Sequence, residues 1–166
     1  MSSRRPPLRA RRLAAALAFA ALAAPAAAQS PSPKAAAILE AATAACRAYE
    51  NGSFDAGGAV TPITLRSQFG DVAAEIVDEG EFACSSSRSL CCGSGGCTLS
   101  LVVENTAYAW QATGWRLVEW GPETVLLLAR DGGWCGGAGS EVCHEAVNWS
   151  AGRPLTVGEA PLPPRE

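Results

Sequence analysis

Residues 98–129 read TLSLVVENTAYAWQATGWRLVEWGPETVLLLA and contain four short apolar segments. Turn residues separate the segments, at Asn105-Thr106, Thr113-Gly114 and Gly121-Pro122. Strands that follow one another so closely favour antiparallel hairpins, because a two-residue turn joins only antiparallel neighbours. The stretch therefore predicts the centre of an antiparallel β-sheet. The expected strands cover residues 98–104, 107–112, 115–119 and 124–129.

An alanine-rich run over residues 34–50 predicts an α-helix before these strands. Ser32 is a good capping residue and Pro33 suits the first helical position, while Asn51-Gly52 is a natural end. Spacings of three or four residues place one set of side chains on a common face, namely Ile38, Ala42, Ala45, Cys46 and Tyr49. We therefore expect Cys46 to point inward and to tie the helix to the rest of the protein.

Three further strands are expected, over residues 59–66, 73–77 and 142–149. The predicted fold class is α+β and mostly β, with an N-terminal helix packed on a small antiparallel β-sheet or sandwich that is stapled by disulfides. A single domain is expected over residues 33–157. A short, polar and disordered lead at 29–32 is expected before the domain, and a proline-rich, disordered tail at 158–166 after it.

The N-terminus has the features of a secretion signal. Five arginines precede an apolar stretch over residues 13–24, and Ala26-Ala27-Ala28 fits the small-residue cleavage pattern. The apolar stretch is shorter than the roughly 20 residues that a membrane-spanning helix needs. We expect a signal peptide over residues 1–28, with cleavage before Gln29 and no membrane insertion afterwards. The alanine and arginine bias indicates a bacterial protein, located in the periplasm or secreted.

Cleavage would also make the net charge of the remaining protein more negative. The whole chain has 13 basic and 16 acidic residues and a formal charge of −3. The signal removes five basic residues and no acidic one, so the expected charge of the remaining chain is −8. Such a surface repels phosphates, which excludes nucleic acid as the expected partner. It attracts a basic partner.

All seven cysteines lie after the expected cleavage point, and in an exported protein they are expected to pair. Because seven is odd, one thiol remains or pairs between molecules. Cys135 and Cys143 flank a glycine-rich loop and are expected to bond to each other. The remaining connectivity is open, among Cys46, Cys84, Cys91, Cys92 and Cys97.

Residues 84–97, CSSSRSLCCGSGGC, form the most distinctive segment. Glycines between cysteines predict a tight, disulfide-pinned loop in which glycine adopts positive φ angles. The phosphate-binding pattern that ends in Gly-Lys-Ser/Thr is absent. Zinc sites need two close cysteine or histidine pairs, and Cys135 and Cys143 are too far apart to form the second one. We therefore expect neither a cofactor nor a metal.

No complete catalytic set is present, so the expected function is not enzymatic. Trp134-Cys135-Gly136 resembles the start of a thioredoxin-like motif, but Ala138 stands where the second cysteine would be. Two enzymatic alternatives remain open. One is thiol chemistry at Cys91 or Cys135, and the other is acid–base chemistry at Glu75 and Asp78.

The leading hypothesis is a non-catalytic periplasmic or secreted module that binds a protein or a cell-envelope component. Trp110, Trp115 and Trp120 are the candidate binding aromatics. Strand alternation places Trp115 and Trp120 on opposite faces, so one of them is expected to be exposed. An exposed indole also stacks on sugars, which leaves glycan binding as a further alternative.

The segment Cys92-Gly93-Ser94-Gly95-Gly96-Cys97, together with Gly114-Trp115-Arg116-Leu117 and Cys135-Gly136, resembles a group of proteobacterial exported proteins. The resemblance covers roughly residues 46–150 and implies a compartment and a fold style, with no activity. Members often have an aromatic residue where this chain has Cys91. The resemblance thus implies that Cys91 is the odd thiol and that the other six cysteines form three bridges.

The same group often carries an aspartate-rich stretch, similar to a calcium loop, before the first loop cysteine. Here Ser67, Phe69 and Val72 stand at three of its positions. Calcium needs six or more oxygen ligands. We therefore expect this chain to lack that site.

Overall fold

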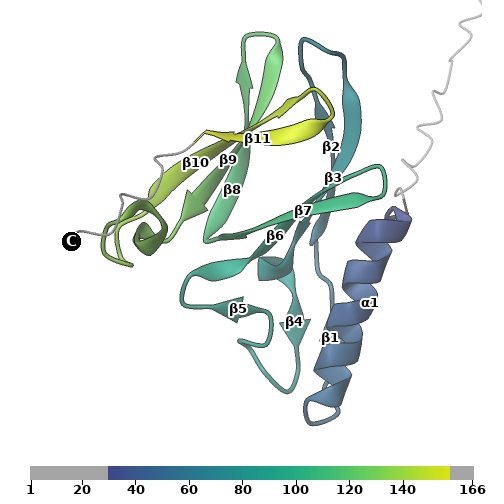
Figure 1. The fold of residues 1–166 in the computed structure, drawn as a ribbon. Coiled ribbons are helices and arrows are strands. Elements are labelled where there is room, and N and C mark those ends of the chain that lie inside the picture. The colour runs from purple at the N-terminus through teal and green to yellow at the C-terminus, as the bar shows by residue number, and fades with distance from the viewer. Residues whose placement is uncertain (1–29, 158–166) are drawn as a thin grey trace, which may run out of the picture.

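The computed structural model describes residues 30–157. The expected signal peptide and the expected C-terminal tail lie outside these residues. The described part forms three layers, which are a helix and two antiparallel sheets (Figure 1). The predicted fold class, mostly β with one helix and three disulfides, is confirmed.

The first sheet lies in the middle layer. Its strands are β2 (Val60–Leu65), β3 (Val72–Asp78), β6 (Gly96–Val103) and β7 (Thr106–Ala112), with the short β5 (Cys92–Gly93) paired to the start of β6. The second sheet is a meander of β8 (Gly114–Trp120), β9 (Glu123–Arg130), β10 (Cys143–Ser150) and β11 (Arg153–Val157). A small ribbon of β1 (Phe54–Asp55) and β4 (Ala83–Cys84) completes the set.

The main core lies between the two sheets. Alternate residues of each strand point into it, as the period of two requires. Ile76 and Leu101 of the first sheet and Leu126 and Leu128 of the second are almost completely buried. The neighbouring residues of these strands point away from this core and form the outer faces of the two sheets.

Helix α1 (Pro33–Ala48) covers the outer face of the first sheet, where Ala35 packs with Val77 and Val102. The Ser32 side chain accepts a hydrogen bond from the Ala35 amide, as expected for a capping residue. The expected common face of the helix was wrong at Ala45 and Tyr49, which are both exposed, whereas Cys46 is buried as expected. The helix ends at Ala48 and Tyr49 adopts an extended backbone, so its side chain leaves the helical face and is 48% exposed.

The two sheets are joined along both sides. The Thr124 amide donates to the Arg66 carbonyl at 3.0 Å, which ties the end of β2 to the start of β9. On the other side the expected hairpin at Thr113-Gly114 was wrong, because β7 pairs with β6 and β8 with β9, so the chain passes here from one sheet to the other. The Thr113 amide donates to the Ala129 carbonyl at 2.8 Å. These links fix the position of β8 relative to the first sheet.

Strand β11 was not predicted. It lies at the edge of the second sheet and contains Pro154, which lacks the amide that a central strand would need. Its sequence has no clear alternation, and only its pairing with β10 makes it a strand.

Three disulfides close the ends of these elements. Cys46–Cys84 ties the end of α1 to β4, Cys92–Cys97 closes the hairpin of β5 and β6, and Cys135–Cys143 closes the loop after β9. The expectation for Cys46 and the expected Cys135–Cys143 pair agree with this arrangement. Cys91 is unpaired. None of the helices in the described part is long and apolar enough to span a membrane.

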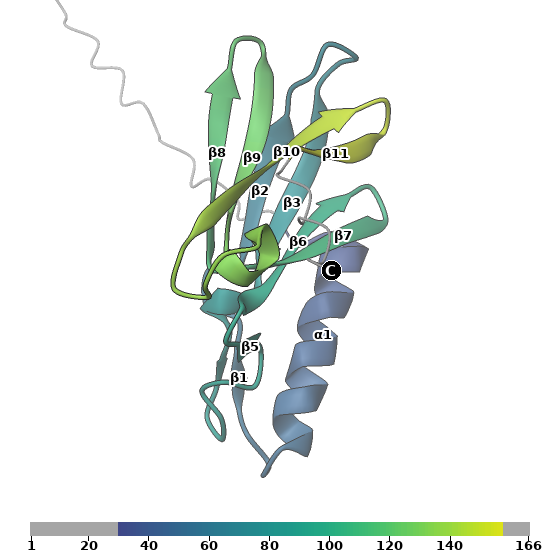
Figure 2. The ribbon, with the colours of Figure 1, turned by 60° about the vertical axis from the view of Figure 1, so that its left-hand side comes forward.

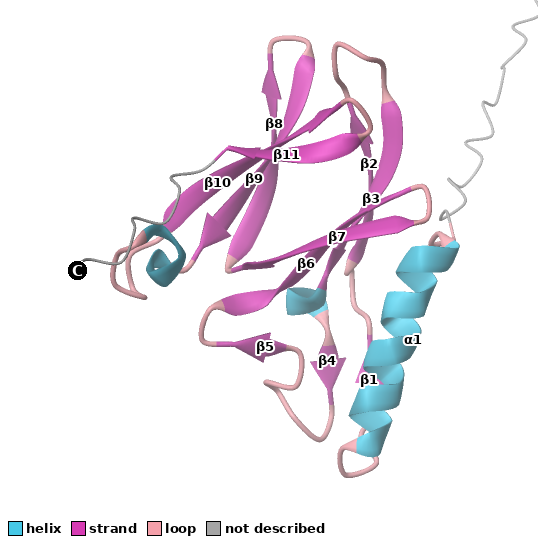
Figure 3. Cartoon of the chain, viewed as in Figure 1, coloured by secondary structure: helices cyan, strands magenta, loops and turns pink. Residues whose placement is uncertain are grey.

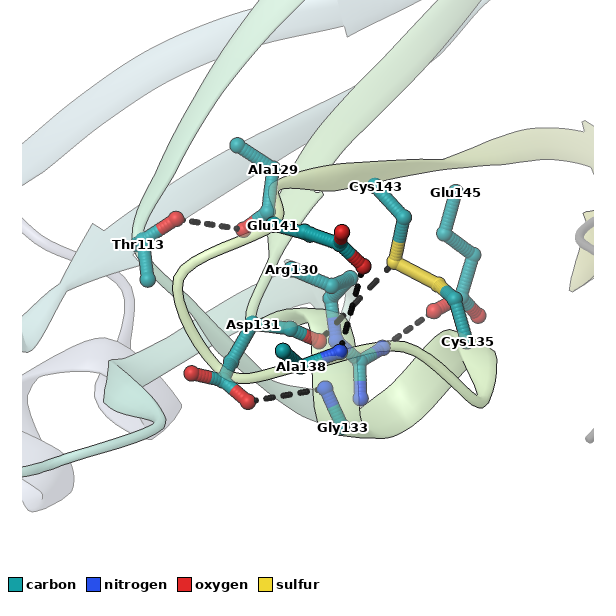
Figure 4. The surroundings of a disulfide bond; sticks show 10 residues. All are labelled: Thr113, Ala129, Arg130, Asp131, Gly133, Cys135, Ala138, Glu141, Cys143 and Glu145. Carbon is teal, nitrogen blue, oxygen red and sulfur yellow. Dashed lines mark hydrogen bonds and ion pairs between the residues drawn. A yellow bond between two sulfur atoms is a disulfide. The ribbon is translucent and has the colours of Figure 1, made fainter.

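The Cys135–Cys143 loop also has polar supports (Figure 4). The Asp131 carboxylate accepts from the Gly133 amide at 2.9 Å, and Glu141 accepts from the Ala138 amide at 3.2 Å. The buried Arg130 forms an ion pair with Glu145 beneath the loop. These contacts hold the loop against the end of the second sheet.

The disulfides should differ in their contribution to stability. A bridge stabilises mainly by restricting the unfolded chain, so a longer closed loop contributes more. Removing Cys46–Cys84, which spans 38 residues, by a double change to alanine is expected to lower the free energy of unfolding by about 4 kcal/mol. Removing Cys92–Cys97, which spans five residues, is expected to cost about 2 kcal/mol.

Urea unfolding of the oxidised proteins measures both values. Cys91→Ser is the control and should change the free energy by less than about 1 kcal/mol. Equal losses for the two disulfide variants would contradict the loop-length explanation.

Candidate functional site

A hollow of about 620 Å³ opens where β3 ends and β8 begins, and we name it the disulfide-end hollow. Asp78 at the end of β3, Glu81 in the turn that follows it and Trp115 of the second sheet line the hollow, beside Ser94 and Cys97 of the glycine-rich hairpin. Figure 2 shows this hairpin, at β5, below the two sheets. Several features that stood out in the sequence therefore meet at one place.

Asp78 joins the two sheets at this hollow. One carboxylate oxygen accepts a hydrogen bond from the Trp115 ring nitrogen at 2.9 Å. The other accepts from the Gly80 amide at 2.8 Å and caps the short helix η1 (Glu79–Glu81), the small cyan helix that follows β3 in Figure 3. Asp78 therefore fixes both the indole ring and the acidic turn.

Two further carboxylates lie on η1. Glu81 is exposed, whereas Glu79 is partly buried. Burial raises the pKa of Glu79, a hydrogen bond with the Thr98 side chain lowers it, and the neighbouring Asp78 charge raises it, with a net rise from 4.5. Glu79 therefore takes up a proton more readily than an ordinary glutamate.

The glycine-rich hairpin is held by its backbone geometry as well as by its disulfide. Cys92 pairs with Cys97 and Gly93 with Gly96 across the two strands. Gly96 has a φ of 103°, and a Cβ there would lie 2.2 Å from the Ala112 carbonyl oxygen, so only glycine fits. Of the three glycines in this loop, only Gly96 has the positive φ that was expected.

The unpaired Cys91 lies next to this hairpin and is partly buried. Burial raises the pKa of its thiol, and the Glu79 charge raises it further. Because the thiolate is the nucleophile, this environment lowers the reactivity of Cys91 at neutral pH. Cys135, the other candidate for thiol chemistry, is bound in a disulfide.

The two carboxylates of the acid–base alternative do not meet. Glu75 points to the helix side of the first sheet, where it accepts a hydrogen bond from the Ser32 amide at 3.0 Å. Asp78 points to the opposite side and bonds Trp115. Residues three apart on a strand face opposite ways, so β3 cannot bring them together.

The three candidate tryptophans have different surroundings. Trp110 and Trp115 are partly buried against the main core, and Trp120 is 74% exposed at the hairpin of β8 and β9. Sequence reasoning missed Phe69 and Trp134, which are also exposed. Phe69 precedes Gly70 in a turn, and Trp134 follows Gly133 in the short helix η2 (Gly132–Cys135). A large apolar residue beside a glycine and outside the expected strands is the signal that could have identified them.

Within residues 30–157, no three His, Cys, Asp or Glu side chains are grouped so that they could hold a metal ion. Comparisons with protein families, with curated proteins and with solved structures gave no match for this chain. The chemistry of the site must therefore be inferred from its own residues.

The raised pKa of Glu79 predicts a pH-dependent cost to stability. Above the ordinary pKa of 4.5 the unfolded state releases a proton that the folded state retains, so the free energy of unfolding falls as pH rises through this range. Glu79→Gln removes this pH dependence of the free energy of unfolding. The stability of the variant relative to the wild type should increase between about pH 4 and about pH 7.

Urea unfolding at several pH values measures this difference. The matched control is Glu40→Gln, at an exposed position on α1. Parallel pH profiles for Glu79→Gln and Glu40→Gln would contradict the assignment.

The Cys91 thiol should react slowly for the same electrostatic reason. At neutral pH its alkylation by iodoacetamide is expected to be slower than that of cysteine in an unfolded peptide. Glu79→Gln removes the nearby negative charge and should speed the reaction. Mass spectrometry of the modified protein gives the rates, and a wild-type rate at or above that of the peptide would refute this prediction.

Proposed function

We propose that this protein is a non-catalytic exported module that binds a basic protein through the disulfide-end hollow. The observation that carries the proposal is the arrangement of Asp78, Glu81 and Trp115 around a hollow that has no basic residue in its lining. Carboxylates beside an indole suit the side chain of an arginine or lysine. The proposed ligand is therefore a cationic side chain on the surface of a partner.

The rigidity of the hollow favours binding. The Cys92–Cys97 bridge, the close approach at Gly96 and the Asp78–Trp115 hydrogen bond already hold the lining in place. Groups that are ordered before the partner arrives lose less conformational entropy on association. The site therefore needs little rearrangement to accept a charged side chain.

Long-range electrostatics support the same partner. Without the expected signal peptide the chain has eight more acidic than basic residues. A net negative charge increases the rate of encounter with basic proteins and repels acidic ones. Exposed carboxylates then add specificity at the point of contact.

The proposed location is the periplasm or the external medium. Three disulfides are typical of an oxidising compartment, and the features of residues 1–28 are those of a secretion signal. The raised pKa of the Cys91 thiol and the separation of Glu75 from Asp78 favour binding over catalysis.

Titration with a hexa-arginine peptide tests the proposed site. Binding is expected to change the fluorescence of Trp115, to weaken with added salt, and to be absent for an uncharged peptide of equal length. Glu81→Gln should weaken binding about threefold, since one exposed ion pair contributes little. Glu40→Gln, a distant change of the same charge, is the matched control.

No saturable binding by the wild type, or equal weakening by Glu81→Gln and Glu40→Gln, would refute the site. A pull-down from a periplasmic extract, run in parallel with wild-type and Glu81→Gln protein, would then identify the partner. The expected partner is a basic protein retained by the wild type and reduced on the variant.

A further inference from the structure

The outer face of the second sheet is mostly apolar at its centre, where Asn148 on β10 is a polar exception. The residues of β9 that alternate with the buried Leu126 and Leu128 are Val125 and Leu127, which point away from the core. Strand pairing places other outward apolar residues around these two. They are Val118 and Trp120 on β8, Ala146 on β10 and Leu155 on β11.

A strand with apolar residues on both faces is typical of a sheet that is covered on both sides. In the first sheet this cover is present, because α1 packs on its outer face. Figure 1 shows α1 and the second sheet on opposite sides of the first sheet. Among residues 30–157 no helix or strand packs on the outer face of the second sheet.

The charged residues of this face lie at its edges. Arg116 on β8 and Arg153 on β11 are exposed, and neither forms an ion pair within the described residues. The Glu123 carboxylate accepts a hydrogen bond from the Asn148 side chain at 2.9 Å. An apolar centre with a polar border is the usual composition of a protein interface.

We propose that a second copy of this chain covers the face. The two second sheets would pack face to face about a two-fold axis that runs parallel to their strands. This axis places β8 of each copy opposite β11 of the other, and β9 opposite β10. The inference concerns a different surface from the disulfide-end hollow and does not depend on the proposed function.

The register of the strands makes the face complementary to itself about this axis. Trp120 pairs with Glu123, and Arg153 pairs with Ser150, at the same end of the sheet. Two-fold rotation therefore brings Trp120 of one copy opposite Arg153 of the other, where the cation can lie over the indole ring. One step along the strands, Val118 comes opposite Leu155.

Other orientations lack this match. A two-fold axis across the strands would place Trp120 opposite the far end of the same strand, at Gly114. With the axis along the strands, Arg116 of one copy lies on the same edge as Arg153 of the other, but four residues away along the strands. Four residues are about 13 Å, which is more than the screening length at physiological salt, about 8 Å. A strand spacing of about 4.8 Å gives about 14 Å between β8 and β11, so the dimer is small and reversible.

The distance between β8 and β11 within one copy provides a specific test of the dimer. Within one copy Trp120 and Arg153 are too far apart to touch, so any energetic coupling between them arises across the dimer. Sedimentation of the purified, oxidised protein should show a monomer–dimer equilibrium. Trp120→Ala and Arg153→Ala should each raise the dissociation constant, by about tenfold for Trp120, and the double variant should be weaker by less than the product of the two effects.

Val125→Glu should abolish the dimer by placing a charge at its centre. Ala109→Glu is the matched control, because Ala109 is exposed on the first sheet and lies outside the proposed interface. Glu81→Gln should leave the dimer unchanged, which separates this result from the test of the hollow. If Val125→Glu fails to fold, the dissociation constant of the Trp120→Ala variant still tests the proposed interface.

A protein that stays monomeric up to about millimolar concentration overturns the proposal. Additive effects of Trp120→Ala and Arg153→Ala overturn the proposed axis. Loss of the dimer in Ala109→Glu would assign the interface to the first sheet and would also refute it.

Discussion

Strands that are apolar on both faces require cover on both faces, and this constraint organises the whole protein. In β3, Ile76 points to the second sheet while Val77 points to the helix. In β6, Leu101 likewise points to the second sheet and Val102 to the helix. The middle layer is stable only with a helix on one side and a sheet on the other, because exposed apolar area costs about 25 cal/mol per Å².

The candidate site depends on the point where this middle layer ends. Asp78 is the last residue of β3, and there the chain must turn away from the core. Its carboxylate caps the turn and holds the Trp115 ring of the other sheet. One side chain thus performs two structural tasks, and the same geometry leaves Glu81 and the glycine-rich hairpin around an open hollow.

The surroundings of the cysteines separate structural sulfur from reactive sulfur. Six cysteines connect the helix, the hairpin and the loop after β9 to their neighbours. The seventh, Cys91, lies where burial and the Glu79 charge both favour the neutral thiol. A carboxylate beside a thiol has the opposite effect from the basic neighbours that activate catalytic cysteines.

Sequence alone determined the helix, seven strands and the expectation that the cysteines pair, because these follow from local periodicity, turn residues and composition. It did not show that the chain changes sheet at Thr113-Gly114, because a short turn between two strands does not reveal whether they pair. The sequence also marked Asp78, Trp115 and the glycine-rich loop as distinct features. Only the tertiary structure decided that these three lie together, that Glu75 faces away from Asp78, and that Trp120 is exposed while Trp115 is not. Strand alternation states that two residues lie on opposite faces, but which face is buried depends on the packing of segments far apart in the chain. For the same reason β11 could not be predicted, since an edge strand with a proline is defined by its partner.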